Sequence, residues 1–589
     1  MDATVGLRRA EQLYDRVFFE YGDDSVAQLG GVHLYAAESF PSEEADILRR
    51  YFPNLDQPVF ALVNLPEVVK GALFARYSRS ISSLRRLFLD EFVDDLDIAG
   101  DVTIDATVGL RRAEQLYDRV FFEYGDDSVA QLGGGHLACE QASNLLTKVL
   151  EWGRLMAYLE QSTRYIAYDQ RLGGRYRYYR DSQVLNSSLG TRYVGDIDRM
   201  FSTYSELVPV MQDFFRANAP KEPGDSDFAY RQAIKARALD SIRGLLPAAS
   251  LSNVGIYGTG QAYEALLLRM RAHPLPEARS YAGMMLTELR KVIPSFLKRV
   301  DLPDRGGLTS RYLADNRASM DDVTARTFGD AVGGPVADDS VELVDFDPDG
   351  ETKMIAAMLY PYTSLADRTV ESRVRAMSEA ERVAVVRAYC GNRQNRRHRP
   401  GRALERVYYR FDVLSDYGAF RDLQRHRMLT IEWQPLSTRH GYVRPEAVAA
   451  AGEEEQFDAV MARSARLYEA LSAEFGDQAS YAVALAYRIR YSMQMNAREA
   501  MHMVELRTTL QGHPAYRRVC QRMHTLIAEK AGHAAVADLM SFVNYDTDPG
   551  LGRLDAEKRV DKLRTAQSHP SSDLSAGRDG TDDGGLAQG

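Results

Sequence analysis

A short basic motif, within the segment RHRMLTIEWQPLSTRHGY, is the part of this sequence best suited to chemistry. It places Arg425, His426 and Arg427 side by side, and Ser437 and Arg439 follow after a spacer of nine residues. A guanidinium offers forked N–H donors and keeps its proton, so this set suits phosphate groups or a planar ring with negative charge. Because arginines repel cations, the motif favours a nucleotide or dinucleotide site over a metal site. The alternative is a solvated basic face of a helix.

Composition limits the kinds of partner. The formal net charge is −10 and the pI about 5.7, which opposes a third alternative, RNA or DNA binding through the basic motif. Cys139, Cys390 and Cys520 are far apart and form no C-x-x-C pair, so we expect neither a disulfide framework nor a cysteine-based zinc site. No apolar run is long enough to span a bilayer, and the N-terminus has no signal-peptide pattern. These features predict a soluble, cytoplasmic protein without a membrane partner.

One segment occurs twice without a difference. DATVGLRRAEQLYDRVFFEYGDDSVAQLGG stands at 2–31 and again at 105–134. We interpret the second copy as the native context and residues 1–34 as a dispensable, poorly packed or artefactual duplicate. An extra or swapped helix is the alternative.

Helical periodicity dominates the rest of the chain. Apolar residues at three- and four-residue intervals predict helices at 136–161, 228–247, 277–300, 457–475 and 516–543. Short apolar segments predict strands at 58–65 and 340–346. The pattern predicts two α+β halves with a linker between them and a disordered tail, with boundaries at 35–300, 301–339, 340–565 and 566–589.

Two motifs of the second half resemble the signatures of the flavin-dependent thymidylate synthases. The first is R-H-R followed by S-x-R, and the second is MNAREAMHMVELR, which contains Asn496, Arg498 and Arg507. The match has departures. The spacer has nine residues where the family has seven, His440 stands where a tyrosine is expected, and GHPAYR replaces the usual ending of the second motif.

The first half resembles the same family with different losses. Arg154, a seven-residue spacer, Ser162 and Arg164 match the first signature, but WG replaces its first two residues, and SIRGLLP supplies Arg243. The first half has YGTGQAYE where the second has the Asn-Ala-Arg motif, and the second half has Ser480 where the first has Arg243. Segments around Ser78 and Ser128 resemble family segments that touch the flavin.

The resemblance implies an α+β fold of two tandem flavin-dependent thymidylate synthase-like domains, each a small sheet with long helices, arranged as a pseudo-dimer. In this family each active site is shared between subunits. The losses in the two halves are complementary, which implies one composite site and one dead reciprocal site. It also implies that the chain forms a homodimer, a pseudo-tetramer of domains.

The chemistry that the resemblance implies is the methylation of dUMP to dTMP, with FAD as cofactor and NADPH and methylenetetrahydrofolate as co-substrates. Arg507 would be catalytic and stabilise negative charge on the pyrimidine. The implied substrate-binding residues are Glu160, Ser162, Arg164, Arg243 and Arg425. The implied cofactor-binding residues are Ser78, Ser128, Arg425, His426, Arg427, Asn496, Arg498 and His502. No metal is expected.

Several alternatives stay open at the level of sequence. The departures from the signatures favour a catalytically inactive relative that binds flavin or nucleotide as a scaffold or regulator. His502 could be a core histidine instead of a flavin contact. The methionines around it, Met493, Met495, Met501 and Met503, are expected to pack in the core.

Overall fold

The computed structural model describes most of the chain outside its ends. The described residues are 40–57, 59–65, 73, 77, 80, 82–91, 134–172, 174–329, 338–546, 550–552, 554 and 558. The duplicate at 1–34, Ser78, Ser128 and the tail at 566–589 lie outside them. Within the described part, no helix is long and apolar enough to cross a membrane.

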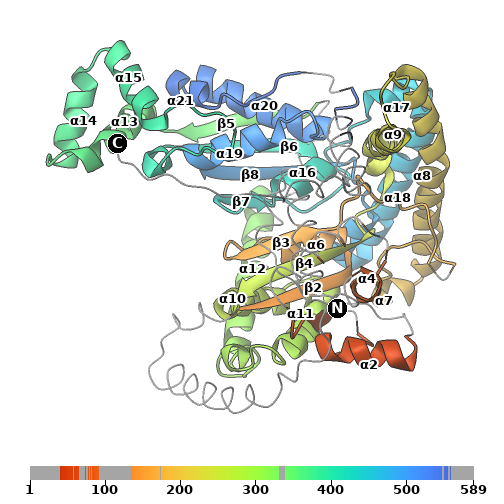
Figure 1. Cartoon of the computed structure of the whole chain (residues 1–589). Helices are drawn as coiled ribbons and strands as arrows, with labels where there is room; N and C mark the ends of the chain where they lie inside the picture. The colour runs from red at the N-terminus through yellow and green to blue at the C-terminus, as the bar shows by residue number, and fades with distance from the viewer. Residues whose placement is uncertain are drawn as a thin grey trace, which may run out of the picture.

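Two antiparallel sheets with the same strand order form the framework (Figure 1). The first sheet has the order β1-β2-β4-β3 and consists of β1 (Val59–Ala61), β2 (Gly134–Ser143), β4 (Leu251–Thr259) and β3 (Met156–Glu160). The second has the order β5-β6-β8-β7 and consists of β5 (Ser340–Phe346), β6 (Tyr408–Asp416), β8 (Arg488–Asn496) and β7 (Leu429–Trp433). The shared order confirms the prediction of two α+β domains arranged as a pseudo-dimer.

Helices surround both sheets, and several of them form a bundle at one side of the molecule (Figure 1). In the first half they are α2 (Ser42–Tyr51), α4 (Leu84–Glu91), α6 (Asn144–Leu150), α7 (Ser182–Leu185), α8 (Gly190–Asn218), α9 (Asp227–Ile242), α10 (Gly260–Arg271), α11 (Pro276–Leu289) and α12 (Gly306–Phe328). In the second half they are α13 (Gly350–Leu359), α14 (Asp367–Ala376), α15 (Glu379–Cys390), α16 (Tyr417–Leu423), α17 (Glu446–Ala450), α18 (Glu454–Phe475), α19 (Ala497–Arg507), α20 (Pro514–Glu529) and α21 (Ala534–Leu539). The bundle joins the halves, because α8 packs against α18 and Arg463 forms an ion pair with Asp196 at 2.6 Å.

Short 3₁₀ helices complete the architecture, and two of them, η6 and η10, carry Arg243 and Ser480. They are η6 (Arg243–Leu245), η7 (Ser295–Leu297), η8 (Tyr360–Tyr362), η9 (Arg402–Arg406) and η10 (Gly476–Ala482). The backbones of η6 and η10 regions bond to each other, since the N–H of Ala248 donates to the carbonyl of Val483 at 2.8 Å. Arg243, the first residue of η6, and Ser480, the fifth residue of η10, are therefore held at the junction of the halves.

The helix predicted at 136–161 is wrong. This segment forms β2, then the short helix α6, and then β3. β2 lies between β1 and β4, and nearly all of its side chains are buried on both faces. A strand buried on both faces has no alternating pattern, so periodicity cannot distinguish it from a buried helix.

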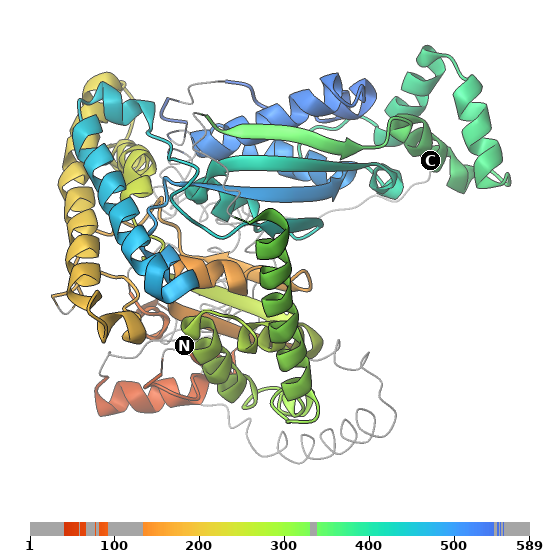
Figure 2. The same cartoon turned by 180° about the vertical axis from the view of Figure 1, so that it is seen from behind.

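The segment expected to link the halves contains a helix. α12 occupies most of residues 301–339, and Figure 2 shows it running from the helices of the first half towards the second sheet. Within α12 only Gly306 is buried. Weak periodicity in the sequence therefore reflects a helix that contributes little to the core.

Two short helices, α6 and α16, lie between the sheets and position the site. Each follows the second long strand of its half, and the side chains of Ser143 and Asp416 cap their N-termini. The helices bond to each other across the halves. The hydroxyl of Tyr417 donates to the carbonyl of Asn144 at 2.9 Å, and Gln424 Nε2 donates to the carbonyl of Lys148 at 2.8 Å. When the two helices are aligned on their N-caps, Lys148 is equivalent in position to Arg421, and Val149 is equivalent to Asp422.

Candidate functional site at the junction of the halves

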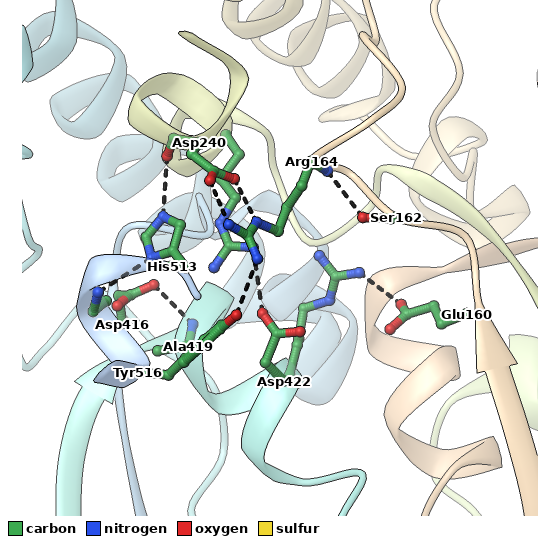
Figure 3. A network of polar contacts seen from close by, with 12 residues as sticks. Glu160, Ser162, Arg164, Asp240, Asp416, Ala419, Asp422, His513 and Tyr516 are labelled. Atoms are coloured by element: carbon green, nitrogen blue, oxygen red, sulfur yellow. Dashed lines mark hydrogen bonds and ion pairs between the residues drawn. The ribbon is translucent and has the colours of Figure 1, made fainter. Parts of the chain in front are cut away.

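Arginines from both halves converge beside α16, and Figure 3 shows one of them, Arg164, near Asp240, Asp422 and Tyr516. We call this set the arginine cluster, and it consists of Arg164, Arg243, Arg421, Arg425 and Arg507. The first two belong to the first half and follow β3 and α9. The others belong to the second half and lie at the end of α16, just after it, and at the end of α19.

Arg164 joins the two halves directly. Its Nε and Nη2 donate to the two carboxylate oxygens of Asp240, each at 2.6 Å. Its Nη1 donates to the hydroxyl of Tyr516 at 3.0 Å, and Nη2 also donates to the carbonyl of Gln511 at 2.9 Å. Burial by itself would lower the pKa of Arg164, but Asp240 and Tyr516 raise it above its usual value. The guanidinium is therefore charged, and four of its five N–H groups already have partners.

Asp422 is a resident anion inside the arginine cluster. Its Oδ1 accepts from Arg425 Nη2 at 2.6 Å, and its Oδ2 accepts from Arg243 Nη1 at 3.4 Å. Burial opposes ionisation of this carboxyl. Arg425, Arg243, Arg507 and Arg164 outweigh burial and hold its pKa far below the usual range. One carboxylate thus faces four of the five arginines.

Arg243 keeps one edge open. Its Nη1 contacts Asp422, but Nε and Nη2 are buried and have no hydrogen-bond partner among the described residues. These two donors form the fork that binds a carboxylate or phosphate in a bidentate manner. A Cβ added at Gly418 would lie 3.3 Å from both nitrogens, so the glycine leaves space in front of the fork.

The open edge of Arg243 faces a cavity of about 290 Å³ between the halves. Arg237, Arg444 and Arg518 also line it. Asp416 lies in the same wall, and burial raises the pKa of its carboxyl to about 6. Buried donors without partners are costly, so the cavity suits an oxyanion.

Glu160 forms a buried ion-pair network across the interface. Its Oε1 accepts from Arg421 Nη2 at 2.6 Å and its Oε2 from Lys148 Nζ at 3.1 Å. Burial raises the pKa of Glu160, but Arg421 and Lys148 outweigh this effect and bring it to about 2. The side chain therefore holds the halves together and has little capacity to accept a bond from a ligand.

His426 orients the side chain of Arg507. Its Nδ1 bonds Glu499 Oε1 at 2.9 Å, and Arg507 Nε donates to its Nε2 at 3.0 Å. Burial and the neighbouring arginines, Arg507 first, hold the pKa of His426 well below its usual value. The ring is therefore neutral, with its proton on Nδ1.

His426 also belongs to a group that could hold a metal ion. The ligand atoms of His426, Glu499 and His502 lie within 4.8 Å of one another. Arg399 and Arg427 act on Glu499 and its neighbours and place positive charge around the group. This charge disfavours a divalent cation and agrees with the sequence expectation of a nucleotide or flavin ligand.

A second cavity, of about 520 Å³, lies where the basic motif of the second half meets β3 and α10 of the first. His426 and Arg427 line it, and Arg427 Nη1 donates to the carbonyl of Met156 in β3. Among the described lining atoms, Gln261 Oε1 and Gln424 Oε1 are buried and without a hydrogen-bond partner. These acceptors suit the ring N–H of a flavin, so the residues present fit the cofactor that the resemblance implies.

Three expected site residues have other partners. Asn496 caps α19 by accepting from the N–H of Glu499 at 2.9 Å. Arg498 Nε donates to the carbonyl of Pro400 at 3.0 Å and holds the loop before η9. Ser162 Oγ accepts from the N–H of Arg164 at 3.3 Å and stabilises that turn.

The ring of His502 lies edge-on to that of His426 with centroids 5.4 Å apart, and burial lowers the pKa of His502 to about 3. His502 is half-buried, while the four methionines beside it are buried, as expected for core packing.

Comparison with known proteins decides the family. The model described as thymidylate synthase complementing protein matches residues 78–295 and 342–532, which together exceed half of the chain. The chain belongs to this family. The resemblance to flavin-dependent thymidylate synthases is thereby confirmed in both halves.

Relatives of similar length occur in distant organisms. A UPF0159 protein of Chlamydia muridarum is 39% identical over 526 residues, which cover 88% of this chain and 98% of that protein. A UPF0159 protein of Thermoplasma acidophilum is 31% identical over 517 residues, which cover 83% and 98%.

Among solved structures, the UMP/dUMP methylase PolB of Streptomyces cacaoi is similar in two complexes. The complex with 5-Br UMP is 16% identical, covers 36% of this chain and 99% of PolB, and has a TM-score of 0.28. The complex with 5-Br dUMP is 19% identical, covers 35% and 97%, and has the same TM-score of 0.28.

The reciprocal junction between the halves has different residues. Ser480 stands where the first half has Arg243, and its hydroxyl donates to the carbonyl of Leu436 at 2.7 Å. Val149 is equivalent in position to Asp422. Arg439 is the counterpart of Arg164 and is exposed. At the reciprocal junction, Arg243 and Asp422 are thus replaced by uncharged residues, and the counterpart of Arg164 is exposed.

Several residues of the site were not predicted: Lys148, Asp240, Arg421, Asp422, His513 and Tyr516. Arg421 and Asp422 precede Arg425 by four and three residues, so helical spacing could have placed them beside it. Tyr516 and His513 lie in GHPAYR, the segment that departs from the family ending. His513 Nε2 donates to the carbonyl of Asp240 at 3.1 Å.

Proposed function

We propose that this protein methylates a uracil nucleotide, dUMP to dTMP, at one composite site in the arginine cluster. The observation that supports this most is the open fork of Arg243, a buried anion-binding edge built by the first half and covered by α16 of the second. Family membership supplies the reaction type. The difference between the two junctions supports one site per chain.

The protein's own residues would divide the work of binding. The phosphate would bind the Arg243 fork in front of Gly418, with Arg164 and Ser162 beside it. Arg507 would stabilise negative charge on the pyrimidine ring, as a preorganised donor held by His426. Arg425 would neutralise the remaining charge. Glu160 would act through Arg421 as a positioning residue.

FAD is the proposed cofactor. His426 and Arg427 would hold it at the larger cavity, with Gln261 and Gln424 as acceptors for ring N–H groups. When bound and reduced by NADPH, it supplies the hydride or relays the methylene group from methylenetetrahydrofolate. Cys139 and Cys520 are buried, and burial raises the pKa of both thiols, so neither is suited to attack the base.

A specific observation favours the second candidate, an inactive relative that binds nucleotide or flavin. Asp240 already occupies both donors of the Arg164 fork, and Asp422 already bridges Arg243 and Arg425. In an active enzyme these carboxylates must yield part of their bonds to the phosphate. In a binding protein these carboxylates keep all of their bonds.

Absorption spectroscopy tests both candidates. The purified protein is titrated with FAD and then with dUMP, and dTMP is measured after addition of NADPH and methylenetetrahydrofolate. We expect about one FAD per chain, a shift of the flavin band with dUMP, and formation of dTMP that Arg507→Gln abolishes. Binding without dTMP would leave the inactive relative, and absence of both would reject the proposal.

A further inference from the structure

We propose that Trp152 forms the aromatic wall of a binding site for a planar heteroaromatic ring with N–H donors at its edge. The site is the larger cavity between the halves. This inference deepens the proposed function and rests on it, because the isoalloxazine ring of a flavin, the pterin of a folate and a uracil base all have this chemistry. No role was expected for the segment that carries Trp152, since it is the degenerate copy of the basic motif.

Trp152 is held in place as a wall of the cavity. The residue remains 37% exposed, although its Nε1 donates to the carbonyl of Ile431 at 3.2 Å. Trp433 supports it from the side, with ring centroids 5.5 Å apart and an interplanar angle of 76°. An aromatic ring that is fixed and partly exposed at a cavity offers a stacking surface at little conformational cost.

Gly153 lies in a turn that has no space for a larger side chain in the present packing. A Cβ at this position would lie 2.5 Å from Tyr158 Oη and 3.2 Å from Met156 Sδ, so a larger residue requires these side chains to move. A histidine, as in the second half, therefore does not fit this turn. The first half has an aromatic surface where the second half has a cation.

The polar groups of the cavity define the edge of the ligand. Gln261 Oε1 comes from α10 of the first half and Gln424 Oε1 from the end of α16 in the second. Both are buried acceptors without a partner among the described residues, so a ligand N–H would satisfy each of them. Because the two acceptors belong to different halves, the ligand would bridge the pseudo-dimer.

The charged groups favour a ligand with negative charge. Arg269 Cζ lies 5.4 Å from the centroid of the Trp152 ring, and Arg154 Nη2 donates to Thr430 Oγ1 at 2.7 Å. Together with Arg427 they line the same cavity. Of the two acids in its wall, Glu151 is already paired with Lys148. A ring that carries a phosphate or carboxylate tail meets these conditions.

Intrinsic fluorescence tests this site directly. The chain has two tryptophans, Trp152 and Trp433, and they pack against each other at the cavity. The full-length protein is titrated separately with FMN, folate and dUMP. We expect the probe whose ring binds at Trp152 to quench tryptophan emission. A comparison of the three probes then shows whether this ring is a flavin, a pterin or a uracil.

Variants then test whether the quenching ligand binds against Trp152. Calorimetry of the quenching ligand should show that Trp152→Ala raises its Kd about tenfold or more, as expected for loss of a stacking partner. Trp152→Phe should raise Kd by less than Trp152→Ala. The control is Tyr257→Ala, because Tyr257 of β4 is an aromatic residue with the same exposure of 37% and is not among the residues that line this cavity. It should leave Kd within about twofold. If Trp152→Ala does not fold, Gln261→Leu tests the same cavity and should raise Kd about fivefold.

The outcomes separate this inference from the proposed function. Flavin binding by absorption that is unaffected by Trp152→Ala and Gln261→Leu would overturn the Trp152 site and the placement of FAD in the larger cavity, while the proposed methylation, measured as dTMP formation, would stand. Quenching that depends on Trp152, without any dTMP formed, would support the site and reject the methylase. If none of the three probes quenches, the site is rejected, and dTMP formation remains as the separate test of the function.

Discussion

Arg164 of the first half donates to the hydroxyl of Tyr516 in the second half at 3.0 Å, and the same ring also faces Arg507. The guanidinium carbons of Arg164 and Arg507 lie 5.9 and 5.6 Å from the ring centroid. One tyrosine therefore holds a cation from each half. Neither half alone can assemble this arrangement, so it is a property of the tandem chain.

The Arg164–Tyr516 pair should be energetically coupled. Tyr516→Phe keeps the ring and removes one hydrogen bond, so we expect it to lower the free energy of unfolding by about 1 kcal/mol. In a double-mutant cycle with Arg164→Lys, the coupling should be about 0.5–3 kcal/mol, measured by urea denaturation. Tyr545→Phe is the control, since the hydroxyl of Tyr545 bonds His524 at an exposed site. Additive effects of the two changes would contradict the direct link.

Gly418 should be required for anion binding. In Gly418→Ala the new methyl would lie 2.9 Å from Asp416 Oδ1 and 3.3 Å from the open donors of Arg243, and it would block the fork. We expect the Kd for dUMP, measured by calorimetry, to rise about tenfold, which corresponds to about 1.4 kcal/mol. Alanine is the better helix former, so the fold should be kept.

Gly283→Ala provides the matched control for that change. Gly283 also lies within a helix, α11, and a Cβ there would meet nothing within 4 Å. It should leave the Kd for dUMP unchanged. An unchanged Kd in Gly418→Ala would show that the phosphate does not bind in front of Arg243.

Asp422 should compete with the ligand for the arginines. Asp422→Asn removes the resident charge, so inorganic phosphate should bind about tenfold more tightly and raise the Tm of the variant more than that of the unchanged protein. Without phosphate the variant should be less stable, because buried arginines lose their counter-ion.

Glu264→Gln is the control for the loss of an arginine-paired carboxylate. Glu264 lies on α10 and pairs with Arg299 at 2.6 Å. Its side chain is 12% exposed, and that of Asp422 is 13% exposed. Its Tm should respond to phosphate as the unchanged protein does. Equal phosphate responses in both variants would mean that Asp422 is only a structural partner.

The sequence predicted which distant residues come together better than it predicted the local fold, and the composite site itself stays a prediction. The complementary losses of motif residues in the two halves predicted that Arg243 and Arg425 lie together, and both bond Asp422. Such a prediction is possible because each charged residue at a motif position can be recognised on its own. The central strand β2 was missed because burial on both faces removes the alternation that marks a strand. Asp422 was missed for another reason: a carboxylate beside an arginine motif looks like an ordinary helix pair until the fold brings Arg243 to its other side.

Glu277 should make stability depend on pH. It lies at the start of α11 and accepts bonds from Ser143 N–H at 2.8 Å, Ser143 Oγ at 2.6 Å and Tyr481 Oη at 2.8 Å, the last across the halves. Burial raises the pKa of this carboxyl to about 7, although the bonds it accepts oppose the rise. The folded state therefore keeps a proton that the unfolded chain releases near pH 4.5.

The sign of the effect follows from proton binding. The stabilisation is fully present below about pH 4.5 and is lost as pH rises through about 7, because the folded state binds more protons in between. The loss is about 3 kcal/mol, since one pKa unit corresponds to about 1.4 kcal/mol. We expect urea denaturation at pH 5 and pH 8 to show this difference, and Glu277→Gln to reduce it. Glu288→Gln, a buried glutamate of the same helix paired with Lys291, should retain the difference. A pH dependence unchanged by Glu277→Gln would assign it to other groups.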